Sequence, residues 1–291
     1  MGFESEYPII YSTTIYTPPQ KTKSDSSNAG ENFMGGLMVL VWIGIIIFSI
    51  CRDRKLKRKR AEELRQRQEE QRQHEMAQIK EYYNSAYYKC TGLSLQQIYS
   101  DAGKTGEFQI YRRMKYLERD GARFLFNVYI PKEDGTTTEI DSLMICRKGI
   151  VVFESKNYGG WIFGDEDSKE WCQVLPDKRH TTQKFYFYNP VKQNKAHTKH
   201  LANFIDDDIT TFSVVLFSDD CTFRMNTAEI GSALVGYYSW VTHFWRDYIE
   251  SEEDTLTDEQ CQEIYDKLYP CVQVDEEVKA QHIANIENMK N

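Results

Sequence analysis

The sequence predicts a mixed α/β domain behind a single N-terminal transmembrane helix and a polar helical linker. An uncharged apolar run at residues 33–51 indicates the transmembrane helix. Beyond residue 100, the apolar patterns follow the order helix, three strands, helix, strand, which is typical of a sheet with helices packed on it. The chain of 291 residues is 41% hydrophobic and 27% charged, a balance that is ordinary for a protein that folds.

The apolar run reads FMGGLMVLVWIGIIIFSIC and contains no charged side chain. At roughly 1.5 Å per residue it spans about 28 Å, close to the hydrocarbon thickness of a bilayer. A cleaved signal peptide is disfavoured, because the run is long, begins late and precedes its basic cluster. A buried core helix is disfavoured because the run is apolar on every side.

The charges that flank this run predict its orientation. The basic cluster Arg52–Arg60 follows directly, whereas the segment before the run carries only Lys21 and Lys23. The positive-inside rule therefore places the N-terminus outside the plasma membrane and the rest of the chain in the cytoplasm. The basic cluster is expected to lie on anionic headgroups. Residues 1–32 are polar and are expected to form a disordered outer tail.

Residues 52–90 are expected to form a basic and polar helical linker. Glu63 and Arg67 have the i,i+4 spacing that supports a helix. Apolar residues are sparse and keep no heptad, which favours a solvated single helix. The alternative is a coiled-coil dimer.

Residues 91–226 are expected to form the α/β domain. Thr105 is the predicted N-cap of a helix that runs through FQIYRRMKYLERDG. Strands are predicted at residues 122–130, 138–146 and 149–156, and the apolar run of the third predicts burial on both faces.

A glycine-containing loop around a short strand is expected after the third strand. A second helix follows at residues 189–205, with Asn189 as its N-cap and Pro190 in its first position. A fourth long strand is predicted at residues 210–220. Residues 227–291 are expected to be mostly helical.

Charge is distributed unevenly along the chain. Residues 100–205 carry 17 Lys and Arg against 14 Asp and Glu, a net of +3, and residues 206–291 carry 5 against 19, a net of −14. Only the middle of the chain is therefore compatible with a polyanion. The seven cysteines include no Cys-x-x-Cys pair, which disfavours a disulfide framework and a zinc ribbon.

Three charged residues lie in predicted strands, where charges are scarce. Asp141 lies inside the second strand, and Glu154 and Lys156 end the third. A turn at residues 147–148 places Asp141 opposite Glu154, whereas a turn at residues 148–149 places it opposite Lys156. Both registers put all three side chains on one face, because side chains alternate with a period of two.

This arrangement predicts a metal site. Two opposed carboxylates about 5 Å apart repel unless a cation lies between them. Oxygen ligands suit Mg²⁺ or Mn²⁺, which can polarise a phosphoryl oxygen and activate water. Lys156 would reach the same point, and Glu107 in the first helix would supply a third carboxylate. The alternative is a structural ion pair between Lys156 and Asp141 or Glu154.

Gln193 and His197 have i,i+4 spacing on the second predicted helix, so they can face the same cleft. A histidine in such a position also occurs as a packing or surface residue, and we do not predict that these two residues bind the metal.

Together these segments resemble the nuclease-related domain family, NERD. The matching pieces occur in the family's order over roughly residues 100–225: GKTGEFQIYRRMKYL, TEIDSLMICRKGIVVFESKNYGGWIFG, KEWCQ, FYFYNPVKQNKAH and FSVVLFSDDCTF. The family is regarded as a branch of the PD-(D/E)XK nuclease superfamily, similar to Mrr-like restriction endonucleases. The resemblance therefore implies a restriction-endonuclease-like αβββαβ core.

The resemblance also implies a function, a metal-dependent nuclease that hydrolyses phosphodiester bonds in DNA with Mg²⁺ or Mn²⁺. The alternative is a non-catalytic module on the same scaffold that binds nucleic acid or protein. The acidic residues 227–291 lie outside the resemblance. By position in the family's motifs, the implied roles are catalysis by Glu107, Asp141, Glu154, Lys156 and Gln193, metal binding by Asp141 and Glu154, and substrate binding by His197.

Overall fold

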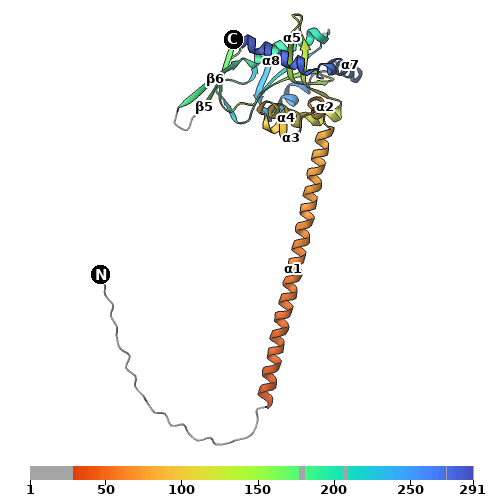
Figure 1. Ribbon diagram of the computed structural model, residues 1–291, viewed down its shortest axis with the longest axis vertical. Coiled ribbons are helices and arrows are strands. Elements are labelled where there is room, and N and C mark those ends of the chain that lie inside the picture. The colour runs from red at the N-terminus through yellow and green to blue at the C-terminus, as the bar shows by residue number, and fades with distance from the viewer. Residues whose placement is uncertain (1–28, 177–180, 206–208, 273, 291) are drawn as a thin grey trace, which may run out of the picture. The chain divides into compact units, whose positions relative to one another are not determined.

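The computed structural model describes residues 29–176, 181–205, 209–272 and 274–290 (Figure 1). The chain divides between Gln73 and His74 into two units. The predicted tail lies outside the described residues, except for its last four residues, which begin the first helix.

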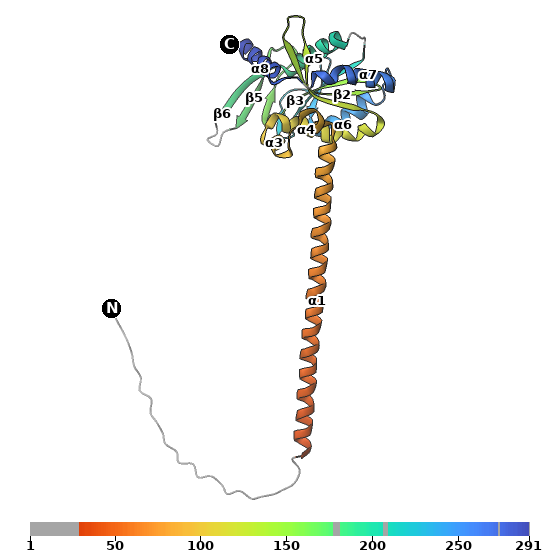
Figure 2. The ribbon, with the colours of Figure 1, turned by 45° about the vertical axis from the view of Figure 1, so that its right-hand side comes forward.

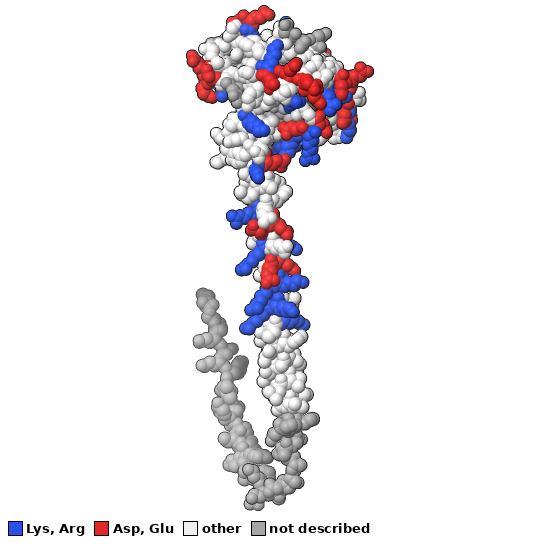
Figure 3. Space-filling view, turned by 90° about the vertical axis from the view of Figure 1, so that its right-hand side faces the viewer, with Lys and Arg blue, Asp and Glu red and all other residues white. Residues whose placement is uncertain are grey.

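The first helix, α1 (Ala29–Asn84), runs without a break through the predicted transmembrane segment and the predicted linker. Its apolar side chains from Leu37 to Ile50 are mostly exposed, and the basic cluster Arg52–Arg60 follows them, as Figure 3 shows. By length and composition alone, this helix could cross a membrane.

The second unit begins within α1 and contains short helices, then strands. The helical elements before the strands are α2 (Ala86–Thr91), α3 (Leu95–Ser100), α4 (Ala102–Met114) and η1 (Lys115–Asp120). The strands are β1 (Arg123–Pro131), β2 (Thr137–Cys146), β3 (Gly149–Lys156), β4 (Gly160–Phe163), β5 (Glu170–Pro176), β6 (Thr182–Tyr188), β7 (Thr211–Phe217), β8 (Cys221–Phe223), β9 (Ala228–Ile230) and β10 (Ala233–Tyr237). The later helical elements are α5 (Pro190–Ile205), η2 (Tyr238–Trp240), α6 (Val241–Phe244), η3 (Trp245–Ile249), α7 (Asp258–Leu268), η4 (Tyr269–Cys271) and α8 (Glu276–Lys290).

The larger sheet has the strand order β1-β2-β3-β7-β10-β9. Strands β1, β2 and β3 form an antiparallel meander, and β7 then pairs parallel with β3. The order of α4, three strands, α5 and β7 agrees with the order predicted from the sequence, with β4, β5 and β6 inserted before α5.

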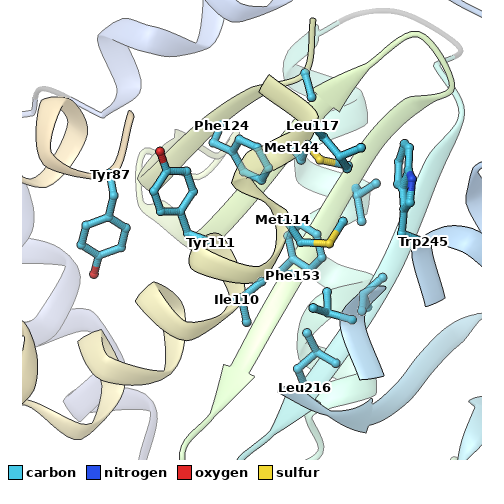
Figure 4. Packing of buried hydrophobic residues seen from close by; sticks show 14 of the residues in the cluster. Tyr87, Ile110, Tyr111, Met114, Leu117, Phe124, Met144, Phe153, Leu216 and Trp245 are labelled. Atoms are coloured by element: carbon cyan, nitrogen blue, oxygen red, sulfur yellow. The ribbon is translucent and has the colours of Figure 1, made fainter. Parts of the chain in front are cut away.

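Strand β3 is buried on both faces, as its apolar run predicts. Val151 and Phe153 pack into the cluster that contains α4, and Figure 4 shows Phe153 beside Met114. Ile150 and Val152 pack into the opposite cluster, which contains side chains of α5 and α7. The middle of the sheet is therefore a rigid support for the residues at the end of β3.

A smaller sheet has the strand order β6-β5-β4-β8. Strands β5 and β6 were not predicted, because nearly every residue of β6 is exposed and its sequence shows no apolar alternation. Figures 1 and 2 show these two strands projecting from the body of the domain. The inner face of this sheet packs through Ile162 and Trp171 against Phe217 of β7.

The start of α4 corrects one prediction. The N-cap is Asp101, whose carboxylate accepts a hydrogen bond from the Lys104 backbone N–H at 2.9 Å. Thr105 lies inside the helix and donates its hydroxyl to the Ile98 carbonyl. The predicted N-cap is wrong because an aspartate, which caps at least as well, lies four residues earlier.

The C-terminal region is mostly helical, as predicted, but it begins with two strands. Strand β10 pairs parallel with β7 and adds a fifth strand to the larger sheet, and β9 pairs with β10. Helix α7 then packs its buried side chains against β1 and β2. The structure therefore builds this region into the same sheet and core as the strands that precede it.

The β2–β3 hairpin adopts the first of the two predicted registers. Cys146 pairs with Gly149 and Ser142 with Phe153, so the turn is formed by residues 147–148. Gly149 has a φ of +130°, and a Cβ atom there would lie 2.2 Å from the Thr210 carbonyl oxygen. Only glycine fits this position without displacing the backbone.

Replacing Gly149 with alanine is expected to lower the free energy of unfolding by about 1–3 kcal/mol, because the new Cβ meets backbone at an unfavourable φ. Urea denaturation measures this change. The control is Gly135→Ala, since Gly135 also has a positive φ, 79°, but has open space around it. Equal losses in both variants would show that the close contact with Thr210 does not matter.

Candidate active site

The hairpin brings Asp141 and Glu154 to adjacent positions at the point where β2 and β3 separate. Ladder pairing between the strands ends at Ser142 and Phe153, and Asp141 and Glu154 are the next residues on each strand. A carboxylate oxygen of Asp141 (Oδ2) accepts the Ser155 backbone N–H at 3.2 Å. The predicted register is thus present, and the two acids lie just beyond its last pair, at the open end of the hairpin.

Glu154 and Lys156 form a buried ion pair. The Lys156 ammonium (Nζ) donates to Glu154 Oε1 at 2.6 Å and to the Gln193 side-chain oxygen (Oε1) at 3.2 Å. Glu154 is 1% exposed. The predicted hairpin residues and the predicted helix residue Gln193 therefore meet in one hydrogen-bonded group.

His197 approaches the same group from one turn further along α5. Its Nε2 lies 3.3 Å from Glu154 Oε2, although the two atoms do not have hydrogen-bond geometry, and its Nδ1 contacts the Thr138 hydroxyl at 2.8 Å. The imidazole is buried. The predicted i,i+4 pair on α5 thus faces the hairpin.

Glu107 lies on α4 and is also buried, at 4% exposure. Its Oε1 accepts the Lys104 ammonium at 2.9 Å, and the same ammonium donates to the Asn127 side chain at 2.6 Å. Lys104 was not among the predicted residues, although its i,i+3 spacing from Glu107 is a signal for such a pair. No hydrogen bond joins Glu107 to Asp141 among the described contacts.

Tyr238 is a further residue that the sequence did not indicate. Its hydroxyl contacts the Ser155 hydroxyl at 2.9 Å, between the two charged residues of β3. A Cβ atom at position 106 would lie 2.2 Å from the Tyr238 oxygen and 2.5 Å from the Ser155 oxygen, so Gly106 allows α4 to approach them. The first turn of η2 thus supports the backbone that carries Glu154 and Lys156.

The electrostatics of the two hairpin acids differ. Burial and the nearby Glu154 carboxylate raise the pKa of Asp141 to about 6. Burial also acts to raise the pKa of Glu154, but Lys156 and His197 outweigh it, so that pKa lies below its ordinary value. Burial acts to lower the pKa of Lys156, and the two carboxylates reverse this and raise it. Glu154 is therefore ionised at neutral pH.

Two carboxylate oxygens in this region lack a partner in the part of the chain that the structure describes. Glu154 Oε2 and Glu107 Oε2 are buried and have no hydrogen-bond partner among the described residues. Carboxylate oxygens are the ligands that Mg²⁺ and Mn²⁺ prefer, and two carboxylates suffice when water and substrate supply the other ligands. Within the described residues, no cluster of three or more His, Cys, Asp or Glu side chains could enclose a metal ion.

The buried Glu107 predicts a pH-dependent stability. Burial raises its pKa to about 8, with Lys104 opposing the shift. A carboxyl whose pKa is raised on folding stabilises the protein fully below its unfolded pKa near 4.5, and this stability is lost as pH rises through 8.

The melting temperature, measured with a chelator present, is therefore expected to fall by several degrees between pH 5 and pH 9. The Glu107→Gln variant is expected to lose most of this fall, because an amide does not titrate. An unchanged pH profile in this variant would contradict the assignment.

Part of the chain that includes the candidate site is similar to known proteins. Residues 102–218 match the family model of the nuclease-related domain, NERD. The chain is also 28% identical over 186 residues to an uncharacterized protein of Bacillus anthracis, a match that covers 64% of this chain and 84% of that protein. No solved structure matches the chain. The matched region contains the β2–β3 hairpin, α4 and α5, so the similarity to the nuclease-related domain, which the sequence motifs indicate, includes the elements of the candidate site.

Proposed function

We propose that this protein is a membrane-anchored, metal-dependent nuclease that hydrolyses phosphodiester bonds in DNA. The observation that supports this most strongly is the buried group at the open end of the β2–β3 hairpin, where Asp141, Glu154 and Lys156 converge. The family description points to the same chemistry. The proposed scaffold is a restriction-endonuclease-like core of α4, β1, β2, β3, α5 and β7.

In this proposal Asp141 and Glu154 hold Mg²⁺ or Mn²⁺. A divalent cation held there supplies charge stabilisation to phosphoryl oxygens and lowers the pKa of water. Lys156 orients the attacking water or offsets charge on the phosphorus, and Gln193 fixes the position of the ammonium through the 3.2 Å hydrogen bond. Glu107 contributes a further acid, and His197, which lies beside Glu154, contacts substrate.

The membrane anchor is residues 33–51 of α1. We propose that they cross the plasma membrane with the N-terminus outside. The basic cluster Arg52–Arg60 follows them directly, and such clusters are retained on the cytoplasmic side. Fusing a cytoplasm-dependent reporter to the C-terminus tests this orientation. Activity of that reporter, and none from the same reporter at the N-terminus, is the expected result.

The nuclease proposal is tested with the full chain purified in detergent. Cleavage of labelled DNA is measured with Mg²⁺ or Mn²⁺ and compared with the Asp141→Ala variant. We expect cleavage that a chelator abolishes and that the variant lacks. Equal activity in the variant, or no activity in either protein, rejects the proposal.

The second candidate is a non-catalytic module that binds nucleic acid or protein on the same scaffold. It is favoured by the weak net charge of +3 over residues 100–205 together with the net charge of −14 over residues 206–291. This candidate predicts that calorimetry detects no binding of a divalent cation. It also predicts unchanged function in a Lys156→Gln variant.

A further inference from the structure

The outer face of the smaller sheet displays aromatic rings. Paired residues of neighbouring strands point to the same face, so Tyr186 of β6 shares a face with Phe163 of β4 through their common partner Cys172. Tyr186 is 65% exposed and Phe163 is 39% exposed. Tyr188 lies two residues along β6 and therefore points to the same side.

Trp161 of β4 completes this set. It shares the outer face with Lys184, because both pair with Val174. We call Trp161, Phe163, Tyr186 and Tyr188 the aromatic face. The opposite face of the same strands packs into the core, where Phe187 lies near Trp171 and Tyr158. The exposed rings are therefore not required to close the core.

Two cations accompany the rings. The Arg224 guanidinium carbon lies 5.2 Å from the centre of the Trp161 ring, and Arg224 is itself exposed. Lys184 is exposed next to Tyr186 on the edge strand. Neither cation forms an ion pair with another residue within the described ranges. Unpaired cations between exposed rings complement a ligand that has both phosphates and flat bases.

The aromatic face is linked to the hairpin site by short stretches of chain. Strand β4 begins four residues after Lys156, and β6 ends one residue before Asn189, whose carbonyl accepts the backbone N–H of Gln193. On the inner side of the same sheet, the ring centre of Tyr158, two residues after Lys156, lies 4.9 Å from that of Phe187. The strands that carry the aromatic face are therefore joined directly to β3 and α5, the elements that carry the candidate site.

We propose that the aromatic face binds single-stranded DNA, with bases stacked on Tyr186 and Phe163 and phosphates near Lys184 and Arg224. A single strand is expected because its bases are accessible. The flat faces of bases are free to stack on side chains only when they are not stacked within a duplex. This inference rests on the proposed function and specifies its substrate as DNA with unpaired bases.

The test is DNA binding by the full chain in detergent, with a chelator present so that no metal-dependent cleavage occurs. Fluorescence anisotropy is measured with a labelled oligothymidine of about 16 nucleotides. Tyr186→Ala is expected to weaken binding by about tenfold, and Tyr186→Phe, which keeps the ring, is expected to bind like the natural protein. Phe185→Ala is the matched control, because Phe185 is 46% exposed on the same strand but points to the opposite face.

The inference is overturned if the oligonucleotide does not bind, if Tyr186→Ala binds as well as the natural protein, or if Phe185→Ala loses as much affinity. A duplex that binds as tightly as the single strand also overturns it. Cleavage by the same proteins separates the two proposals. If binding depends on Tyr186 but no DNA is cleaved, the DNA-binding role of the aromatic face stands and the nuclease proposal fails. If DNA is cleaved equally with and without the Tyr186 ring, the nuclease proposal stands and the role of the aromatic face fails.

Discussion

Replacing Lys156 with glutamine is expected to lower kcat for DNA cleavage on the order of 10²–10³-fold. The Lys156 ammonium is the one charged donor that joins Glu154 and Gln193 among the described contacts. Glutamine keeps a side chain of similar reach that can still donate to Glu154, so the buried carboxylate is not left without a partner. The variant therefore removes the positive charge and retains most of the packing.

Two measurements accompany this prediction. Calorimetry with Mn²⁺ is expected to show that the variant still binds the cation, because Asp141 and Glu154 remain. Lys89→Ala, on an exposed position of α2, is the control and is expected to cleave normally. Normal cleavage by Lys156→Gln would contradict a catalytic role and would favour the structural ion pair.

Replacing Trp171 with alanine is expected to lower the free energy of unfolding by about 3–5 kcal/mol. The indole is fully buried, and its ring centre lies 5.9 Å from the ring of Phe217 in a stacked arrangement. Its Nε1–H donates to the Asp165 carbonyl at 2.9 Å. The substitution therefore removes a large apolar side chain, a ring contact and a hydrogen bond together.

Chemical denaturation of the full chain measures this loss. Tyr116→Ala, on an exposed ring of η1, is the control and is expected to change stability by less than about 0.5 kcal/mol. The Trp171 variant should also cleave DNA poorly, because Phe217 pairs with Lys156 in the ladder between β3 and β7. A loss below about 1 kcal/mol would show that the smaller sheet does not depend on this contact.

The parts of the fold that could be predicted are those with a strong local pattern. Strand β3 is an unbroken apolar run, and its burial on both faces follows from that. The N-cap of α5 also followed from local chemistry, since Asn189 accepts the backbone N–H of Val191 at 3.0 Å. Strand β6 lacked such a signal, because nearly all of its residues are exposed and its aromatic residues fall on both faces.

In the candidate site too, contacts set by local sequence could be predicted and long-range contacts could not. The placement of Asp141 and Glu154 on neighbouring strands at the same end of the hairpin follows from the period of a strand and a two-residue turn. It could therefore be derived from the sequence, except for the choice between two registers. The contact between Tyr238 and Ser155 could not, because it joins residues 83 positions apart through the pairing of β10 with β7. The catalytic and metal-binding roles of these residues remain predictions.

The most direct test of the central claim is to locate a divalent cation at the hairpin. Crystals grown with Mn²⁺ are expected to show an anomalous peak between Asp141 and Glu154, at about 2.0–2.4 Å from an oxygen of each. Crystals of Asp141→Ala grown in the same way are expected to lack that peak. Saturating Mn²⁺ with no peak between these carboxylates, or a peak that persists in the variant, would contradict the account.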